Sequence, residues 1–249
     1  MKIKKKNKIS IITVTKNSEK FLEKNILSVY KQSYRNYEHI IIDGLSRDKT
    51  LKIVKKHKNK IKYWISEKDK GIYDAMNKGI KRASGDIIGI LNSDDIYYKK
   101  TLETVNKYFN KNKDLDFLFG SVFKRKLLTG YYPKRIFWTF GFYTTHSVGF
   151  FIKRKAQLKV GYYNIKYKGS SDYDLFYRMI VKKKLKGIST KKNEIFGYFR
   201  PGGYSSTQRY RNFLYECNQI RIDNGQNKIY VYLIFMLRFL RNIKLFFLK

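Results

Sequence analysis

Residues 86–95 read Asp-Ile-Ile-Gly-Ile-Leu-Asn-Ser-Asp-Asp, a short apolar run that ends in two carboxylates. Such a run is typical of a strand that is buried on both faces, as in a parallel sheet covered by helices. Ligands of open α/β sheets bind at the C-terminal ends of these strands. Because two adjacent acids there are costly as bare charges, a cation, a polar ligand or solvent should balance them. Taken alone, the ten residues favour an ordinary polar turn, and the rest of the chain reverses that preference.

The first 120 residues alternate between strand and helix patterns. Short apolar runs rich in β-branched residues predict strands at Ile9–Val14, His39–Ile42, Ile61–Ile65, Ile87–Leu91 and Leu115–Phe119. Apolar residues at helical spacing predict helices at Glu19–Tyr30, Asp48–His57, Tyr73–Arg82 and Lys99–Phe109. This alternation predicts an α/β fold, with a mostly parallel sheet joined by right-handed crossovers.

The regular alternation ends near residue 121. Glycine, tyrosine and phenylalanine are frequent through Tyr131–Gly149, which predicts loops that cover a site. A helix is predicted at Asp172–Lys182 and a strand at Glu194–Phe199. The length of 249 residues fits one large α/β domain, or one domain with an appendage.

The net charge of +36 requires an explanation. Nucleic acid, an anionic membrane surface and acidic small molecules are the obvious partners of such a chain. A genome biased toward A and T produces the same excess of lysine, and we assign at least half of the charge to that cause because the lysines are scattered. A hydrophobic content of 43% supports a packed core and excludes a disordered polycation. Charge alone therefore does not identify the partner.

Cysteine usage and the N-terminus bear on the compartment. Cys217 is the only cysteine, which excludes an intrachain disulfide and a cysteine-rich metal site and favours a reducing compartment. Five lysines within residues 2–8 precede Ile9–Val14, in the manner of a signal peptide. That apolar run is too short, contains Ser10 and Thr13 and lacks a cleavage site, so we interpret it as the first core strand.

The final segment, Lys228–Lys249, is apolar at most positions. On a helical wheel one side gathers the polar residues Arg238, Arg241, Asn242 and Lys249, with Lys244 as the outlier. A charged stripe opposite a broad apolar face is typical of a helix that lies in a membrane interface. A helix packed on the domain is the alternative, and the cations within the segment disfavour a membrane span.

Polar side chains follow three of the predicted strands, at Thr15, Asp43 and Asp94. Because the C-terminal ends of parallel strands share one edge of a sheet, we expect these residues to converge on one ligand. Asp43 suits hydrogen bonds to a base or ribose, and Asp94 suits a divalent cation on a diphosphate. Taken singly, each residue is also a candidate helix cap or turn residue. The phosphate-binding loop, the dinucleotide fingerprint and the serine nucleophile elbow are absent from the sequence, which argues against those enzyme classes.

Successive blocks of the chain resemble the motifs of family 2 glycosyltransferases with the GT-A fold. The first four blocks are Ser10-Ile-Ile-Thr-Val-Thr-Lys-Asn17, Ile41-Ile-Asp-Gly-Leu-Ser-Arg-Asp48, Glu67-Lys-Asp-Lys-Gly-Ile-Tyr-Asp-Ala-Met-Asn-Lys-Gly79 and Leu91-Asn-Ser-Asp-Asp95. The resemblance continues through His146, Asp172-Tyr-Asp-Leu175 and Gly202-Gly-Tyr-Ser-Ser206. The block that ends at Gly79 is especially specific, and resembles the branch that builds bacterial surface polysaccharides of the O-antigen, capsule or colanic-acid type. The tail after about residue 210 is not diagnostic.

The resemblance implies an α/β fold of the GT-A type: a single, mostly parallel, Rossmann-like sheet flanked by helices, with a C-terminal helical tail. It also implies three segments. Residues 1–120 are expected to form the nucleotide-sugar-binding half, and residues 121–210 the half that binds the acceptor and carries the catalytic base. Residues 211–249 are expected to form an amphipathic helical tail, a candidate membrane contact.

The resemblance assigns roles to individual residues as well. Those implied to bind the donor nucleotide are Val14, Thr15, Asp43, Asp69, Asp74, Asn92 and Ser93. Asp94 matches the last acid of the family's Asp-x-Asp motif and implies a divalent metal cofactor, Mn²⁺ or Mg²⁺. His146 matches a position near the leaving diphosphate, where it is either a further metal ligand or a structural hydrogen-bonding residue. Asp172 matches the family's catalytic base, on the acceptor side.

Three positions depart from the family pattern. Asn92 occupies the first acid position of Asp-x-Asp, and an amide is a weaker ligand for a hard cation than a carboxylate, so the metal would rest mainly on Asp94, the diphosphate and water. Ser171 stands where the family often has glutamate, which leaves Asp172 without an acidic neighbour. Leu45 replaces a common glycine and puts the conformation of that loop in question.

The implied activity is transfer of a sugar from a nucleoside-diphosphate sugar, expected to be a UDP-sugar, to a hydroxyl of a lipid-linked saccharide in surface polysaccharide biosynthesis. Asp172 would accept the proton of the attacking hydroxyl, the metal would neutralise the departing diphosphate, and in-line displacement would invert the anomeric carbon. We expect a cytoplasmic enzyme bound peripherally at the inner face of the cytoplasmic membrane, with no nucleic-acid partner.

Two other classes of protein remain as alternatives. A nucleic-acid-binding protein is suggested by the charge of +36 and the interleaved tyrosines, although no recognition-helix, zinc-finger or RNA-binding motif is visible in the sequence. A sugar-nucleotidyltransferase also places carboxylates at the end of an α/β strand. Its products differ, because it releases pyrophosphate, whereas sugar transfer releases a nucleoside diphosphate.

Overall fold

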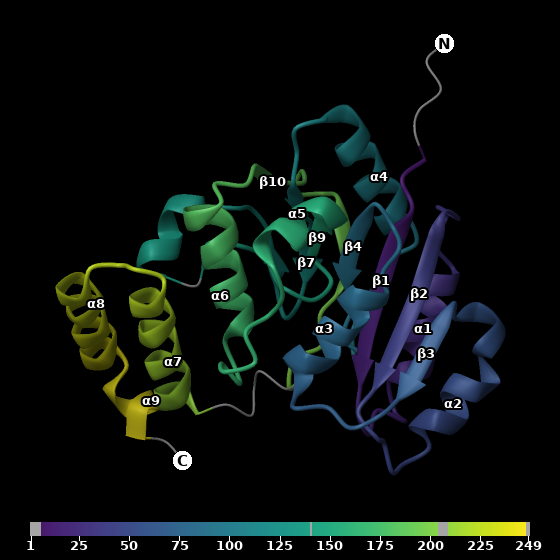
Figure 1. Ribbon diagram of the computed structural model, residues 1–249, viewed down its shortest axis with the longest axis horizontal. Coiled ribbons are helices and arrows are strands. Elements are labelled where there is room, and N and C mark those ends of the chain that lie inside the picture. The colour runs from purple at the N-terminus through teal and green to yellow at the C-terminus, as the bar shows by residue number, and fades with distance from the viewer. Residues whose placement is uncertain (1–5, 140, 204–208, 248–249) are drawn as a thin grey trace.

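The computed structural model describes residues 6–139, 141–203 and 209–247. Within these residues the central sheet has seven strands, which are β1 Ile9–Thr15, β2 Tyr37–Asp43, β3 Tyr63–Ser66, β4 Ile87–Ile90, β6 Phe117–Phe119, β9 Phe150–Lys153 and β10 Gly187–Ser189. Their order across the sheet is β10-β6-β9-β4-β1-β2-β3 (Figure 1). Neighbouring strands from β4 to β3 are parallel, and β10 is parallel to β6. Strand β9 runs antiparallel to β4 and β6 and joins the two groups.

The predicted mostly parallel sheet is confirmed, and its centre is buried because helices cover both faces. Every residue of β1 is buried. Ile12 and Val14 point into one hydrophobic cluster and Ile9 and Ile11 into another, as the two-residue period of a strand requires. Strand β1 thus has no solvent-facing side, and its polar residues Ser10, Thr13 and Thr15 are buried along with the apolar ones.

Helices from both halves of the chain flank the sheet (Figure 1). Helices α3, α6 and α7 contribute side chains to the cluster around Ile12, whereas α1 and α4 contribute to the cluster around Ile9. The four predicted helices of the first half correspond to α1–α4. The bounds are α1 Leu22–Tyr30, α2 Thr50–Lys56, α3 Ile72–Arg82, α4 Thr101–Lys111, α5 Arg154–Val160, α6 Ser171–Tyr177, α7 Tyr210–Asp223, α8 Lys228–Arg241 and α9 Ile243–Phe247, with 3₁₀ turns at Lys58–Lys60 and Pro133–Phe137.

A second, smaller sheet corrects the expectation of a single sheet. Its strands, in the order β5-β11-β7-β8, are β5 Ile96–Tyr97, β11 Ile195–Tyr198, β7 Ser121–Phe123 and β8 Leu127–Leu128. Only β11 lies within a predicted strand, because the other three have two or three residues, too few to show a two-residue period. Gly197 permits the close approach of β11 to β5, because a Cβ there would lie 2.1 Å from the Ile96 carbonyl oxygen.

The two predicted halves of the chain build one sheet. Strands β9 and β10 belong to the segment 121–210, yet they lie in the same sheet as β4 and β6. The predicted helix at Asp172–Lys182 is α6 followed by a π-helical turn at Arg178–Lys182, and the strand predicted at Glu194–Phe199 is β11. The division of the halves by function stays a prediction. Residues 2–5, residue 140, residues 204–206 of the Gly-Gly-Tyr-Ser-Ser motif and Lys249 lie outside the described residues.

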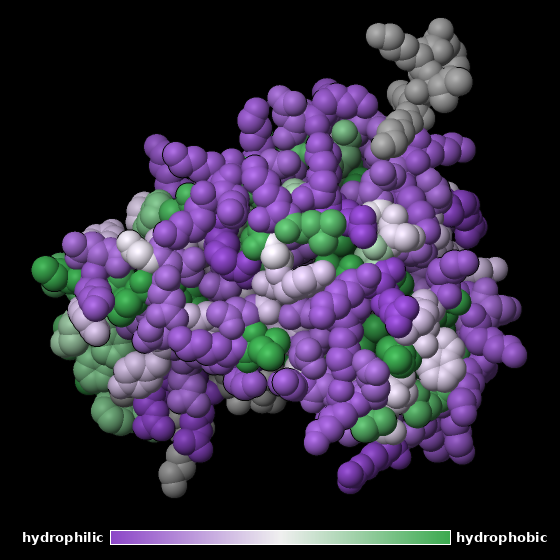
Figure 2. Space-filling model, viewed as in Figure 1, coloured by the Kyte–Doolittle hydropathy of each residue, from purple (hydrophilic) through white to green (hydrophobic). Residues whose placement is uncertain are grey.

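The C-terminal tail differs from the predicted single helix with a charged stripe. The helix breaks at Asn242, between α8 and α9. Arg238 turns inward and donates a hydrogen bond to the carbonyl oxygen of Trp138, so the predicted stripe is wrong at this position. Val231 and Ile234 are buried beside it. Figure 2 shows apolar side chains gathered at the end of the molecule where Figure 1 places α8. None of the described helices is long and apolar enough to cross a membrane.

Candidate active site

A cavity of about 810 Å³ opens at the C-terminal edge of the central sheet. One wall comes from residues that follow β1 and β4, and the other from residues 143–147 and from the start of α6. The sheet edge therefore brings the two predicted halves together, as expected for a parallel sheet. The predicted site residues that line the cavity are Val14, Thr15, Asp69, Asn92, Ser93, Asp94, His146 and Asp172.

Asp43 lies at this edge but behind the cavity wall. The strand register pairs Thr15 with Asp43 and Asp43 with Ser66, so the three residues are neighbours across β1, β2 and β3. The Asp43 carboxylate is buried and accepts hydrogen bonds from the hydroxyls of Ser46 and Ser66. The buried Thr15 hydroxyl has no hydrogen-bond partner within the described part of the chain, so it can bond to a ligand.

The loop after β2 shapes the same wall. Leu45 adopts a φ of 56°, so this position keeps the left-handed turn that glycine favours. Gly44 lets the Asp69 carboxylate lie close to the backbone, because a Cβ there would lie 2.2 Å from Oδ2 of Asp69 and would displace it. Asp69 also accepts the Gly71 N–H at 2.9 Å. Asp74, in the first turn of α3, accepts the backbone N–H of Lys70 and is not among the lining residues, so the structure does not bring it to the cavity.

The segment after β4 is fixed by short polar contacts. The Asn92 N–H donates to the Ser147 hydroxyl at 2.8 Å, and the hydroxyls of Ser93 and Ser18 are 2.8 Å apart. The side-chain oxygen of Asn92 is buried and has no hydrogen-bond partner within the ranges that the structure describes. An orphaned carbonyl oxygen beside a cavity is available to a ligand or a cation.

Asp94 and Asp95 have different surroundings. Oδ2 of Asp94, on the cavity wall, lies 3.2 Å from Nε and 3.1 Å from Nη2 of Arg200. Asp95 is buried and accepts the backbone N–H of Arg200 at 2.8 Å. Burial, together with the neighbouring charge of Asp94, raises the pKa of Asp95 to about 7. Of this pair, Asp94 is therefore the acid that serves the cavity.

Asp172 lies on the opposite wall, in the first turn of α6. Its Oδ1 accepts the Tyr73 hydroxyl at 3.1 Å, and its Oδ2 accepts the Tyr143 hydroxyl at 3.2 Å. Burial and the charge of Asp172 raise the pKa of both tyrosines well above the ordinary value, so both remain hydrogen-bond donors. Two hydroxyls from separate elements thus fix the orientation of the Asp172 carboxylate.

His146 lines the cavity within an aromatic group. Its Nε2 lies 2.6 Å from the Tyr163 hydroxyl, and its ring stacks on Phe150. Burial lowers the pKa of His146, although the nearby charge of Asp172 acts in the opposite direction. These contacts fit the structural role weighed for this histidine. Its role as a metal ligand stays a prediction.

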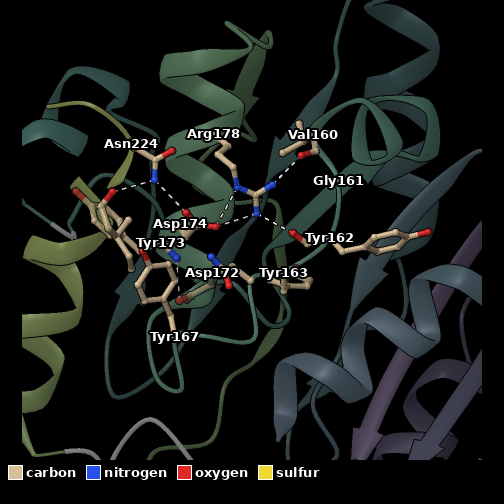
Figure 3. A network of polar contacts seen from close by, with 12 residues as sticks. Val160, Gly161, Tyr162, Tyr163, Tyr167, Asp172, Tyr173, Asp174, Arg178 and Asn224 are labelled. Carbon is tan, nitrogen blue, oxygen red and sulfur yellow. Dashed lines mark hydrogen bonds and ion pairs between the residues drawn. The ribbon is translucent and has the colours of Figure 1, made fainter. Parts of the chain in front are cut away.

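Asp174, two residues after Asp172, belongs to a separate polar network (Figure 3). Its carboxylate accepts hydrogen bonds from Nε of Arg178 at 2.9 Å and from the Asn224 amide at 3.0 Å. The Arg178 guanidinium also donates to the carbonyl oxygens of Val160 and Tyr162. Asp174 therefore joins α6 to α7 and to the segment after α5.

The predicted metal has few ligands from the protein. Among the residues that the structure describes, no group of three or more His, Cys, Asp and Glu side chains is placed to hold a metal ion. The Asp94 carboxylate and the orphaned amide oxygen of Asn92 are the oxygen donors that the segment after β4 offers to a cation. Mg²⁺ in nucleotide enzymes is often bound by one or two carboxylates, with phosphate and water completing its coordination. The residues present thus fit a cation shared with a diphosphate.

Sequence patterns did not identify Tyr73, Tyr143 or Arg200 as site residues. Tyr73 lies within the block from Glu67 to Gly79, and Arg200 directly precedes Pro201, so both were inside or beside segments already noted. Their partners are far away in sequence, with separations of 99 residues for Tyr73–Asp172 and 106 for Arg200–Asp94. Periodicity and spacing record local structure and do not show such pairs.

Comparison with known sequences identifies the family. The model of "Glycosyl transferase family 2" matches residues 10–187. An uncharacterized glycosyltransferase of Methanocaldococcus jannaschii is 30% identical over 187 residues, which cover 69% of this chain and 64% of the relative. The UDP-Glc:alpha-D-GlcNAc-diphosphoundecaprenol beta-1,3-glucosyltransferase WfgD of Escherichia coli is 36% identical over 114 residues, 45% of each chain. The chain therefore spans less than two thirds of the length of these relatives.

Solved structures match nearly the whole chain. TarS of Staphylococcus aureus in complex with UDP-GlcNAc has a TM-score of 0.72 at 18% identity, over 94% of this chain and 73% of that one. The mannosyltransferase PcManGT of Pyrobaculum calidifontis, in complex with GDP-Man and Mn²⁺, has a TM-score of 0.68 at 17% identity, over 96% and 71%. These likenesses confirm the predicted GT-A fold. Because the family model covers well over half of its residues, this chain belongs to glycosyl transferase family 2.

Proposed function

We propose that this chain is an inverting glycosyltransferase that moves a sugar from a nucleoside-diphosphate sugar to a hydroxyl of a saccharide acceptor. The observation that carries the proposal is one cavity with Asp94 on one wall and Asp172 on the other. Its volume of about 810 Å³ suits a ligand of the size of a sugar nucleotide. Membership in the family supports the reaction class.

The proposed chemistry needs one proton acceptor. Asp172 takes the proton of the acceptor hydroxyl as that oxygen attacks the anomeric carbon. Tyr73 and Tyr143 hold the Asp172 carboxylate in place during this step. The bond from the anomeric carbon to the diphosphate oxygen breaks as the new bond forms, so the carbon inverts without a covalent enzyme intermediate.

The proposed donor is a UDP-sugar, bound at the C-terminal edge of the central sheet. The name of WfgD, which specifies UDP-Glc, and the TarS complex with UDP-GlcNAc support this choice. Val14, Thr15 and Asp69 line the wall where the nucleoside would lie, next to Ser93. Asp43, at the same edge of the sheet, is proposed to join them.

The proposed cofactor is a divalent cation, Mn²⁺ or Mg²⁺. Asp94, the amide oxygen of Asn92 and the donor's diphosphate would hold it. When bound, such a cation offsets negative charge on a leaving diphosphate. The structure of PcManGT with Mn²⁺ supports the assignment.

The proposed acceptor is a lipid-linked saccharide, reached at the cytoplasmic face of a membrane. WfgD is named for an acceptor on diphosphoundecaprenol, which supports an acceptor of this class. The apolar outer side of α8 and the net charge of +36 support contact with an anionic lipid surface.

A screen of the purified chain against a panel of nucleotide sugars tests the proposal. Release of nucleoside diphosphate with transfer to an acceptor supports it, whereas release of pyrophosphate would establish nucleotidyl transfer instead. Asp94→Ala should lower turnover by about a hundredfold or more at an unchanged unfolding temperature. Asp114→Ala, at an exposed carboxylate, is the matched control. Full activity of Asp94→Ala, or full activity in excess chelator, removes the cation from the proposal.

A further inference from the structure

Arg200 covers the carboxylate that the proposed cation requires. Its guanidinium places both Nε and Nη2 on the same Asp94 oxygen, at 3.2 and 3.1 Å. The Arg200 backbone N–H is fixed by Asp95, and the guanidinium lies 4.2 Å from the centre of the Phe21 ring. Gly203 packs against Asp94 as well, because a Cβ there would lie 2.8 Å from its Oδ2. The ion pair is thus built by contacts at both ends of the 200–203 segment.

The replacement of an acid by Asn92 makes this ion pair decisive for the charge of the site. A site with two carboxylates would keep one negative charge after pairing with an arginine. Here the amide of Asn92 is neutral, so the single charge of Arg200 balances that of Asp94. A cation that approaches in the absence of donor meets an Asp94 carboxylate already neutralised by Arg200, and must displace the guanidinium from the oxygen it needs.

A nucleoside diphosphate changes this balance. It brings negative oxygens into the cavity, and guanidinium groups bind phosphate oxygens in two-point contacts at least as well as they bind carboxylates. Arg200 then has a second partner of the same chemistry. The Asp94 oxygen becomes free for the cation in the same step, without leaving any charge unpaired.

We propose that Arg200 occupies Asp94 in the donor-free enzyme and exchanges it for the divalent cation when the donor's diphosphate binds. The inference rests on the proposed function and adds a rule for the order of binding. Cation alone binds weakly, and cation and diphosphate strengthen each other's binding. By linkage, the factor by which UDP tightens Mn²⁺ equals the factor by which Mn²⁺ tightens UDP.

Mn²⁺ titration of the full-length protein, followed by the electron paramagnetic resonance signal of free Mn²⁺, tests the exchange without any turnover. Without UDP, Arg200→Gln should bind Mn²⁺ about three- to tenfold more tightly than the unmodified protein, because the competing cation is gone. With UDP this advantage should vanish, and the mutual strengthening of Mn²⁺ and UDP should shrink by the same factor. Arg200→Lys, which keeps the charge without the two-point contact, should lie in between.

Arg125→Gln is the matched control, because it removes the same charge from an exposed turn between β7 and β8. It should bind Mn²⁺ like the unmodified protein. Equal or weaker Mn²⁺ binding by Arg200→Gln without UDP overturns the exchange while leaving the proposed function intact. If the unmodified protein fails to bind Mn²⁺ even with UDP, the proposed cation site itself fails, and the exchange with it.

Discussion

Asp172 and Asp174 stand two residues apart on α6, and their surroundings give them different roles. Asp172 reaches the cavity under two tyrosine hydroxyls, whereas Asp174 is buried against Arg178 and Asn224. The general preference for acids in the first turn of a helix applies to both and does not distinguish them. The hydrogen-bond partners distinguish the two acids, and each acid can be tested separately.

Asp172→Asn should lower kcat by about 10²–10⁴-fold, because a positioned base contributes about that much, while donor binding and the unfolding temperature stay near their original values. Asp174→Asn should lower the free energy of unfolding by up to about 3 kcal/mol, the low end for a buried ion pair because Arg178 is partly exposed. Steady-state kinetics, donor titration and thermal unfolding of both variants separate the two effects. Undiminished turnover in Asp172→Asn would move the base elsewhere.

The two tyrosine hydroxyls on Asp172 give a second prediction. Tyr73→Phe and Tyr143→Phe should each lower kcat about tenfold, because the Asp172 carboxylate loses one of the two contacts that orient it toward the acceptor hydroxyl. The KM for the donor should change little, since the proposed task of both hydroxyls is to orient the base. Tyr167→Phe is the control, as its hydroxyl bonds to Asp223 and this buried residue does not line the cavity. If the double variant Tyr73→Phe/Tyr143→Phe keeps its full kcat, the hydroxyls hold the fold and not the base.

At the scale of elements, Glu38 links β2 to β1 and to the turn before β4. Its Oε1 accepts the Ser10 hydroxyl at 2.6 Å and the Ser84 N–H at 2.7 Å, and its Oε2 lies 2.6 Å from Nζ of Lys8. Burial alone would raise the pKa of Glu38, but the hydrogen bonds from Lys8, Ser10 and Ser84 outweigh it and lower the pKa to about 2. The ionised carboxylate thus contributes to the stability of the central sheet.

Glu38→Gln should therefore lower the free energy of unfolding most at neutral pH. Because the folded pKa is about 2 and the ordinary value 4.5, the contribution is complete above pH 4.5 and is lost as the pH falls toward 2. The contribution of the ionised Glu38 carboxylate to the free energy of unfolding is at most about 3 kcal/mol, at roughly 1.4 kcal/mol per pKa unit. Urea unfolding between pH 3 and pH 7 should show that the difference in the free energy of unfolding between the variant and the unmodified protein becomes smaller as the pH falls. Exposed Glu103→Gln is the control, and a difference independent of pH contradicts the assignment.

The sequence predicted the elements whose patterns are local and missed those that depend on distant partners. Strand β1 was predicted because its burial on both faces gives a run of mostly apolar residues. Helix α3 was predicted because burial of one face places apolar residues at helical spacing. Strand β9 was missed, since its three paired positions acquire their register from β4 and β6. The same limit explains the site. Asp94 and Asp172 were found from motifs, whereas the residues that restrain them come from elsewhere in the chain.

At the scale of the whole molecule, α8 is the most apolar part of the exposed surface. Val231 and Ile234 pack inward, while Ile229, Leu233 and Leu237 face outward, with Leu233 58% and Leu237 69% exposed. The inward turn of Arg238 leaves this outer face without a central charge. Basic residues at the ends of the tail remain exposed, an arrangement typical of a helix that rests on an anionic lipid surface.

Leu233→Glu/Leu237→Glu should release the protein from anionic vesicles. Burial of each leucine in lipid is worth about 1.5–3 kcal/mol, so the partition coefficient should fall by about a hundredfold or more. Substitution is a sharper test than truncation at Asn227, which would also remove the buried contacts of α8. Turnover with a water-soluble acceptor should be unchanged, because neither leucine lines the cavity. Leu158→Glu, at an exposed leucine on α5, is the control, and it should bind vesicles normally. Unchanged vesicle binding by the double variant, or a loss of self-association in its place, would show that this face contacts something other than lipid.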